Sequence, residues 1–400
     1  MCKSHLATRF IGILVLATIV ALGMSGCIIP YDSDQRCDSE ACDPNRWVLV
    51  AADSFFSEQV VDGEVRQPVR VRAPRLCVDY NLRSPADATP LTADPLFAAD
   101  PVGAQRVGDS PPLLAFSLRP AGELTLAAVT TVGDLILAPL GAVRPDAVAM
   151  RMTVGVAWSN AGDRLAVVLR DPSLPITQAH QILILTPQLE ELDRFALDLP
   201  LSDPNGNLVH DRFVVSWNSD DTLVAVSTTA TCNLGACKTS TGAGGSADLM
   251  VSPRCMVVRV ADGAETPLNL SDTYFVGVDQ IVGTRAARAG AQPASDLAAR
   301  VFVMRLRAGD VEVVRRIQGP QFVLSSHPPS GAFITADSFN AVLTSFGLPA
   351  SLRTLDGRRS SISALVPLSL RAGGESFSIL PADQILPAAR AAGLTGNCGP

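Results

Sequence analysis

Two stretches of the chain share one pattern: VAWSNAGDRLAV at residues 156–167 and VSWNSDDTLVAV at residues 215–226. In each, a short apolar segment runs through Trp158 or Trp217, a polar turn follows, and a second apolar segment begins. Strand, tight polar turn and second strand are typical of a β-hairpin. Because the unit recurs along the chain, the sequence predicts a repeat architecture.

Looser copies of the unit place Phe116, Phe275 and Leu324 at the position of the two tryptophans. Further apolar hairpins follow several copies, at residues 182–199, 255–268 and 301–317. Two consecutive hairpins make one four-stranded blade of a β-propeller. Helical periodicity is confined to a short Ala-rich stretch near residues 384–392.

The unit resembles the WSPDG-type repeat of TolB-like β-propellers, in which the aromatic residue fills the gap between neighbouring blades. The resemblance covers roughly residues 113–340 and implies an all-β propeller of roughly six four-stranded blades over residues 46–397. Tandem β-sandwiches are the alternative fold, because they too consist of short strands with frequent turns.

The N-terminus has the organisation of a secretory signal. Lys3 and Arg9 precede an uninterrupted apolar run over residues 11–22, which is too short to span a membrane. The following segment, which ends at Gly26-Cys27, resembles the lipobox of bacterial lipoproteins, although Met24 stands where leucine is usual. An ordinary cleaved signal with a chance cysteine is the alternative.

The lipobox resemblance implies that residues 1–26 are removed and that Cys27 carries acyl chains. Several buried acyl chains would hold a soluble domain on a bilayer. Ile28 follows the cysteine where aspartate would be associated with inner-membrane retention, so the resemblance favours the outer membrane, in a periplasmic or surface-facing orientation. Residues 27–45 then form an acidic tether, and the propeller domain carries a Pro-rich loop at 83–112 and an insertion at 228–254.

Composition excludes several classes of protein. Hydrophobic residues make up 47% and charged residues 18%, which excludes a disordered chain. The formal net charge is −7, with cations scattered along the sequence, which argues against nucleic acid and anionic lipid surfaces as partners.

Cysteine usage fits export to an oxidising compartment. Apart from Cys2 and the predicted lipid attachment site, the cysteines are Cys37, Cys42, Cys77, Cys232, Cys237, Cys255 and Cys398. Disulfides are the expected state, and the odd number leaves at least one thiol free or paired between molecules. The paired spacings at 37/42 and 232/237 leave metal binding as the less favoured alternative.

No catalytic motif, metal site or cofactor motif is predicted. His180, His210 and His327 lack further ligands at metal-binding spacing, so they are interpreted as turn or surface residues. The sequence therefore favours a lipid-anchored binding or scaffolding module for an envelope protein or a small ligand. The alternative is an exported propeller lyase or glycosidase, which would need carboxylates in its central channel.

Length variation points to one face of the disc as the partner site. The predicted blades differ most at their second turns, over residues 171–180, 228–254 and 286–299. Second turns all lie on the same face of a propeller, and loops on a rigid scaffold often carry binding. The candidate binding residues on this face are His180, Thr228, Cys232, Cys237 and Arg288, with a disulfide expected near Cys255.

Overall fold

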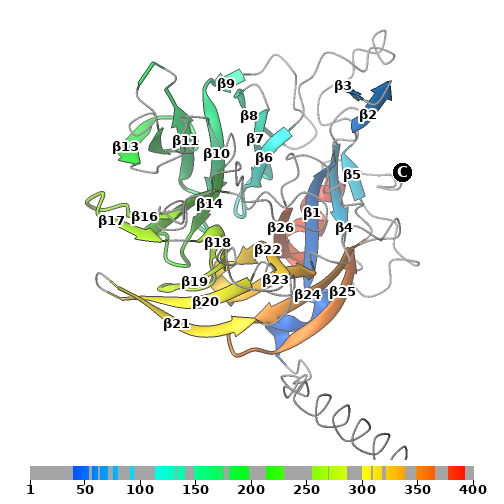
Figure 1. The fold of residues 1–400 in the computed structure, drawn as a ribbon, viewed down its shortest axis with the longest axis vertical. Helices are drawn as coiled ribbons and strands as arrows, with labels where there is room; N and C mark the ends of the chain where they lie inside the picture. The colour runs from blue at the N-terminus through cyan, green and yellow to red at the C-terminus, as the bar shows by residue number, and fades with distance from the viewer. Residues whose placement is uncertain are drawn as a thin grey trace, which may run out of the picture.

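Neighbouring strands of the chain pair in groups of four. The computed structural model describes residues 39–53, 56–61, 64–70, 75–79, 91–93, 113–130, 133–139, 148–171, 173–174, 180–197, 213–228, 255–268, 270–285, 300–307, 310–317, 321–337, 348–364 and 377–391. Within these ranges the strands form six four-stranded sheets and one separate two-stranded hairpin. The innermost strands of successive sheets contact one another around a ring (Figure 1). The fold is therefore the predicted β-propeller.

Five blades, numbered II to VI, each consist of four consecutive antiparallel strands. Blade II contains β6 (Leu113–Leu118), β7 (Thr125–Thr130), β8 (Leu135–Pro139) and β9 (Val148–Met150). Blade III contains β10 (Thr153–Trp158), β11 (Leu165–Arg170), β12 (His180–Leu185) and β13 (Glu191–Leu197). Blade IV contains β14 (Phe213–Trp217), β15 (Leu223–Thr228), β16 (Cys255–Arg259) and β17 (Glu265–Leu268). Blade V contains β18 (Ser271–Phe275), β19 (Gln280–Arg285), β20 (Arg300–Arg307) and β21 (Asp310–Ile317). Blade VI contains β22 (Gln321–His327), β23 (Ala332–Asp337), β24 (Leu348–Thr354) and β25 (Arg359–Ala364).

Blade I closes the ring by joining the two ends of the chain. Its innermost strand, β26 (Phe377–Pro381), pairs with β1 (Trp47–Asp53), which is followed outward by β4 (Arg75–Asp79) and β5 (Leu91–Ala93). The short strand β5 lies inside the segment 83–112, which the sequence placed in an irregular loop. The separate hairpin, β2 (Phe56–Val61) and β3 (Glu64–Arg70), is inserted between β1 and β4.

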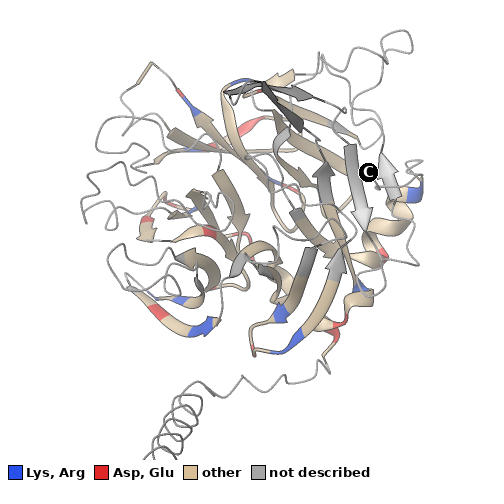
Figure 2. Cartoon of the chain, turned by 45° about the vertical axis from the view of Figure 1, so that its right-hand side comes forward, with Lys and Arg blue, Asp and Glu red and all other residues tan. Residues whose placement is uncertain are grey.

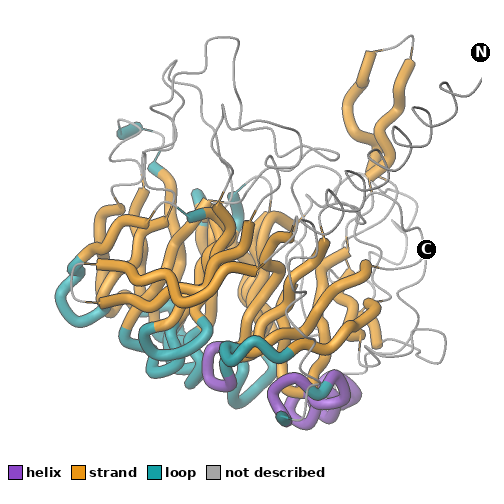
Figure 3. Tube along the Cα trace, turned by 60° about the horizontal axis from the view of Figure 1, so that its bottom comes forward, coloured by secondary structure: helices purple, strands orange, loops and turns teal. Residues whose placement is uncertain are grey.

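The antiparallel order gives the disc two different faces. The first and third turns of each blade lie on what we term the turn face, and the second turns lie on what we term the insertion face. Figure 3 shows the helices and most of the described turns at one face and the β2–β3 hairpin projecting from the other. The turn face also carries the helical elements η1 (Glu40–Cys42), η2 (Pro44–Arg46), η6 (Pro328–Ser330) and α2 (Ala382–Ala391).

Residues 40–45, which the sequence assigned to the tether, are folded next to blade VI. Cys42 is fully buried, and its carbonyl accepts a hydrogen bond from Ser360 Oγ at 2.8 Å. Asp43 caps η2 by accepting from the backbone N–H of Asn45. These contacts fix residues 40–46, so the predicted tether is shorter than 27–45.

The hydrophobic core consists of six clusters, one in each seam between neighbouring blades. Trp158 lies in the seam between blades II and III, and Trp217 occupies the corresponding place between blades III and IV. Their side chains are 6% and 2% exposed, and their strand partners are Leu165 and Val224. The predicted burial of both tryptophans at equivalent positions is therefore confirmed.

Two of the predicted anchors are displaced by two residues. Ser117, Ser216 and Ser325 each accept a backbone hydrogen bond from the following blade. The residue after each of these serines is therefore equivalent to Trp217, which makes Leu118 and Ser326 the seam residues of blades II and VI. Aligning the copies by their large apolar side chains places Phe116 and Leu324 at this position instead. Both side chains are buried in seams.

Two arginines join neighbouring blades on the turn face by the same contacts. The Arg119 guanidinium lies 5.5 Å from the ring centroid of Trp158, and its Nε donates to the carbonyl of Gly162 at 2.6 Å. In the next seam, the Arg164 guanidinium lies 5.1 Å from the ring of Trp217, and its Nη2 donates to the carbonyl of Asp221 at 2.9 Å. Each arginine thus combines a cation–π contact with a hydrogen bond to the turn that follows the tryptophan.

Asp221 fixes the turn between β14 and β15 against blade III. It is 5% exposed and has a φ of 58°, in the left-handed region that the equivalent Gly162 also adopts. Its carboxylate accepts from the backbone N–H groups of Asn160 and Ala161 at 2.8 and 2.9 Å, and from Asn160 Nδ2 at 2.7 Å. Three hydrogen bonds to one carboxylate offset the cost of burying its charge.

Candidate functional site

The propeller axis is lined by one equivalent residue from each blade, the residue immediately before the seam residue. We term this set the channel residues: Ser378, Ser117, Ala157, Ser216, Tyr274 and Ser325, in blades I to VI. They project from the innermost strands β26, β6, β10, β14, β18 and β22. Four of the six carry a serine hydroxyl, so the wall of the channel is both small and polar.

These residues border a cavity of about 390 Å³. At the turn face its mouth is formed by Pro120, Asn160, Pro328, Pro329 and Gln384, from three turns and from α2. Aromatic side chains complete the wall, among them Phe213 and Tyr274. The volume lies within the range of small-ligand pockets.

Hydrogen bonds between blades fix three of the channel serines. Ser117 Oγ accepts from the backbone N–H of Trp158 at 3.0 Å, and Ser216 Oγ accepts from that of Phe275 at 3.0 Å. Ser325 Oγ accepts from the backbone N–H of Ile379 at 3.1 Å. Each serine therefore satisfies a backbone donor on the neighbouring innermost strand while its side chain borders the channel.

The described lining of the cavity includes no aspartate, glutamate, lysine or arginine. Figure 2 shows charged residues mostly on turns and outer strands. His327 is the histidine of this lining, and burial lowers its pKa from 6.5 to about 4. The imidazole is therefore neutral at pH 7, and its Nδ1 lies 2.9 Å from Ser330 Oγ. The described residues of the channel wall therefore carry no formal charge at pH 7.

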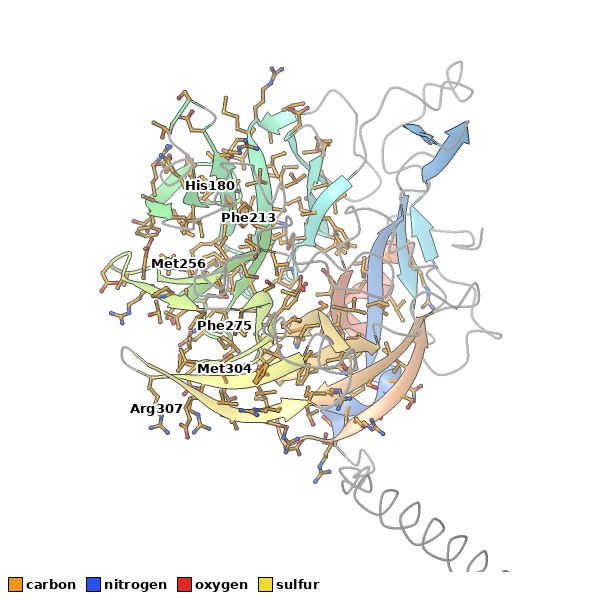
Figure 4. The ribbon with its side chains drawn as sticks, viewed as in Figure 1. His180, Phe213, Met256, Phe275, Met304 and Arg307 are labelled. Atoms are coloured by element: carbon orange, nitrogen blue, oxygen red, sulfur yellow. The ribbon has the colours of Figure 1, made fainter. Side chains whose placement is uncertain are left out.

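The structure describes two of the five candidate binding residues, and it places both in the seam between blades III and IV. His180 begins β12, and its ring centroid lies 5.2 Å from that of Phe213 (Figure 4). Thr228 ends β15 directly opposite Phe213 in the strand register. The other candidates, Cys232, Cys237 and Arg288, lie outside the described residues.

His180 and Thr228 are 1% and 2% exposed, so His180 is not the turn or surface residue that the sequence suggested. The prediction was wrong because His180 alternates with Ile182 and Ile184 on the buried face of β12. Neither ring nitrogen of His180, nor Thr228 Oγ1, has a hydrogen-bond partner within the described ranges. Burial, with a smaller contribution from the nearby charge of Arg170, lowers the pKa of His180 to about 4.

This burial predicts acid sensitivity. Between about pH 6.5 and pH 4 the unfolded chain holds a proton on His180 that the folded chain does not, so stability falls as the pH falls through this window. From pH 7 to pH 4.5 we expect His180 to contribute a loss of about 2–3 kcal/mol. His180→Phe, which keeps an aromatic contact with Phe213, should remove that part of the loss in urea unfolding at the two pH values. A loss in the variant equal to that of the wild type would contradict the assignment. His327, whose pKa burial also lowers to about 4, is present in both chains, so its own contribution cancels in the comparison.

Cys255 is a fully buried free thiol, so the disulfide expected at this residue is not formed. Its side chain packs in the seam between blades IV and V, where burial raises the pKa of the thiol to about 12. Cys42 is bonded in a disulfide. The remaining connectivity stays a prediction.

Comparisons with solved structures identify propellers of similar form. The chain is similar to TolB from Acinetobacter baumannii, with a TM-score of 0.46 and 10% identity over 85% of this chain and 68% of that one. It is similar to the β-propeller domain of the Trilobed protease from Pyrococcus furiosus, with a TM-score of 0.38 and 9% identity over 64% of this chain and 72% of that one. It is also similar to a putative TolB from Agrobacterium tumefaciens, with a TM-score of 0.37 and 14% identity over 67% of this chain and 90% of that one.

No protein-family model and no curated protein matches the sequence. The class of protein, a six-bladed β-propeller, therefore rests on the strand order itself.

None of the helices in the described part of the chain is long and apolar enough to cross a membrane. In the same ranges no three His, Cys, Asp or Glu side chains are grouped so that they could hold a metal ion.

Sequence reasoning missed the channel residues, although the signal is present. A serine precedes the seam residue in four blades, at Ser117, Ser216, Ser325 and Ser378. The shared serine becomes visible only when the copies are aligned by the strand register and not by their aromatic residues.

Proposed function

We propose that this chain is an exported, lipid-anchored β-propeller that acts as a binding or scaffolding module at the cell envelope. The observation that carries the proposal is the uncharged cavity on the propeller axis, open at the turn face between Asn160, Pro329 and Gln384. Its wall is built from six blades and held by hydrogen bonds between them, so it forms a rigid, preformed site. Rigid sites bind without a large loss of conformational entropy.

The same lining gives no support to the enzymatic alternative. A glycosidase of the usual type needs two carboxyl groups flanking the scissile bond. Among the described residues that border the cavity, none carries a carboxylate. An envelope protein or a small ligand that inserts into the channel is the partner that the proposal requires, and nucleic acid is not expected for a chain with a net charge of −7.

The anchor is part of the proposal because Cys27 precedes the propeller by a short segment. The described chain begins at Ser39 on the turn face. The 11 residues between these two positions reach at most about 40 Å when fully extended. A lipidated Cys27 would therefore hold the channel mouth close to the membrane, and the lipobox resemblance favours the outer membrane.

The anchor can be tested by Cys27→Ser. We expect the variant to move from the membrane fraction to the soluble fraction, because it cannot carry the acyl chains that hold the domain on the bilayer. Cys255→Ser is the matched control, since its buried thiol has no role in anchoring. Continued pelleting of Cys27→Ser with carbonate-washed membranes would rule out the lipoprotein interpretation.

The insertion face is the competing location for the partner. Its longest connection, residues 229–254, lies outside the described residues, so the sequence-based hypothesis of a binding face there stays a prediction. Deleting residues 230–252 distinguishes binding at the insertion face from binding at the channel, because it removes this insertion and leaves all six channel residues in place.

A further inference from the structure

The hydrogen bonds of the channel serines determine which chemical groups they offer to a ligand. A hydroxyl has one proton to donate and two lone pairs to accept with. Ser117, Ser216 and Ser325 each use a lone pair to accept a backbone N–H from the following blade. In the described structure none of these three hydroxyls donates its own proton to a protein acceptor. Three hydroxyl protons are therefore left for whatever occupies the cavity.

Burial makes these protons important for selectivity. Ser216 and Ser325 are 6% and 4% exposed, so bulk water reaches them poorly. A buried donor without an acceptor is unfavourable, so a ligand that leaves it unpaired binds more weakly. An occupant that displaces water from this channel must therefore supply acceptors.

The described lining of the cavity favours an uncharged occupant over a cation. A buried cation is stabilised best by a carboxylate, and the described lining has none. Arg119 and Arg164 lie over the rings of Trp158 and Trp217, so these two rings already hold a cation. Phe213 and Tyr274 remain as further aromatic side chains of the wall. His327 is neutral, so the lining supplies no charge to an anion either.

We infer that the channel binds an uncharged group that carries oxygen acceptors, such as an amide or an ester carbonyl, and that the hydroxyls of Ser117, Ser216 and Ser325 donate to these oxygens. The inference rests on the proposed function, because it specifies the chemistry of the same site. Whether the group belongs to a small molecule or to a protruding part of a larger partner, the channel recognises the same acceptors.

Blade III provides a natural comparison for testing this inference. Ala157 occupies the channel position at which blades I, II, IV and VI have serine. Ala157→Ser adds a hydroxyl and removes no native hydrogen bond. Ser216→Ala and Ser325→Ala each remove one donor and also free a backbone N–H in the seam, so their folding is checked by circular dichroism.

The experiment uses two probes that share a six-membered ring, neutral 2,5-diketopiperazine with two carbonyl acceptors and the cation piperazinium. Binding to the detergent-solubilised full chain is measured by ligand-observed NMR. We expect diketopiperazine to bind with a Kd in the millimolar range, about fivefold more weakly in Ser216→Ala or Ser325→Ala, and more tightly in Ala157→Ser. Piperazinium should not bind.

The remaining outcomes overturn the inference in distinguishable ways. Binding of piperazinium without diketopiperazine would keep the channel as a binding site and refute its acceptor selectivity. Binding of diketopiperazine that all three variants leave unchanged would refute the role of the serines. If neither probe binds, both the inference and the channel as a small-ligand site fail, while partner capture still tests the wider proposed function. If the serine variants do not fold, an unchanged affinity in Ala157→Ser suffices to refute the inference.

Discussion

A chain that ends at residue 376 should lose its cooperative unfolding transition. The truncation removes β26, which pairs with β1 over five residues from Trp47 to Ala51. It also removes α2 and the side chains that fill two seams, among them Leu380 and Ile385 next to blade II and Ile379 next to blade VI. Without them β1 is left as an open innermost edge, and blade I has no strand of its own on the axis.

Thermal unfolding and small-angle scattering would measure the effect. We expect a broad, non-cooperative transition and a larger radius of gyration, because an open ring exposes the apolar surfaces of blades I, II and VI. The control is a chain that ends at residue 391, which keeps β26 and α2. A truncated chain with the melting temperature and dimensions of this control would contradict ring closure by β26.

Trp217→Ala should cost about 3–5 kcal/mol of the free energy of unfolding. The indole is 2% exposed and packs with Phe213 and Val226 in the seam between blades III and IV. Its Nε1 donates to the carbonyl of Ala157 at 3.0 Å, and Arg164 covers its ring. The substitution therefore leaves a cavity, an unpaired carbonyl and a guanidinium without its aromatic contact.

Phenylalanine substitutions separate packing from hydrogen bonding. Trp217→Phe keeps much of the buried area and loses the bond to Ala157, for which we expect about 1–2 kcal/mol. Trp158→Phe is the matched comparison, because Trp158 Nε1 has no partner within the described residues. It should cost less than Trp217→Phe in urea unfolding at pH 7. Equal costs, or a loss below about 1 kcal/mol for Trp217→Ala, would contradict the described seam.

The propeller was predictable because its signal is local. The two tryptophan hairpins, the Asp262-Gly263 turn and the alternating apolar segments each form within one blade. The seam residues are harder to place, because their equivalence depends on contacts between blades. Phe116 was chosen over Leu118 since the sequence shows the size of a side chain but not the hydrogen-bond register around it.

The site was less predictable than the fold for the same physical reason. Ser216 and Ser325 are more than 100 residues apart and become neighbours of one cavity only when the ring closes. The sequence predicts His180 to be a turn or surface residue because it lacks further ligands at metal-binding spacing, yet its ring packs on Phe213 from the next blade. The local pattern of apolar and polar residues does not show contacts between blades. A single sequence therefore predicts the blades more readily than the channel that they enclose.

The channel as the partner site can be tested by photo-crosslinking in cells. The photoreactive residue p-benzoylphenylalanine would replace Gln384 at the channel mouth, Leu174 on the insertion face, or Arg307 on the outer side of blade V (Figure 4). All three side chains are exposed, so each position tolerates the substitution. The account predicts a discrete crosslinked partner from position 384 and none from positions 174 or 307. The account would be contradicted by a partner that crosslinks at position 174 but not at position 384. If deleting residues 230–252 also abolished that crosslink, binding would lie on the insertion face.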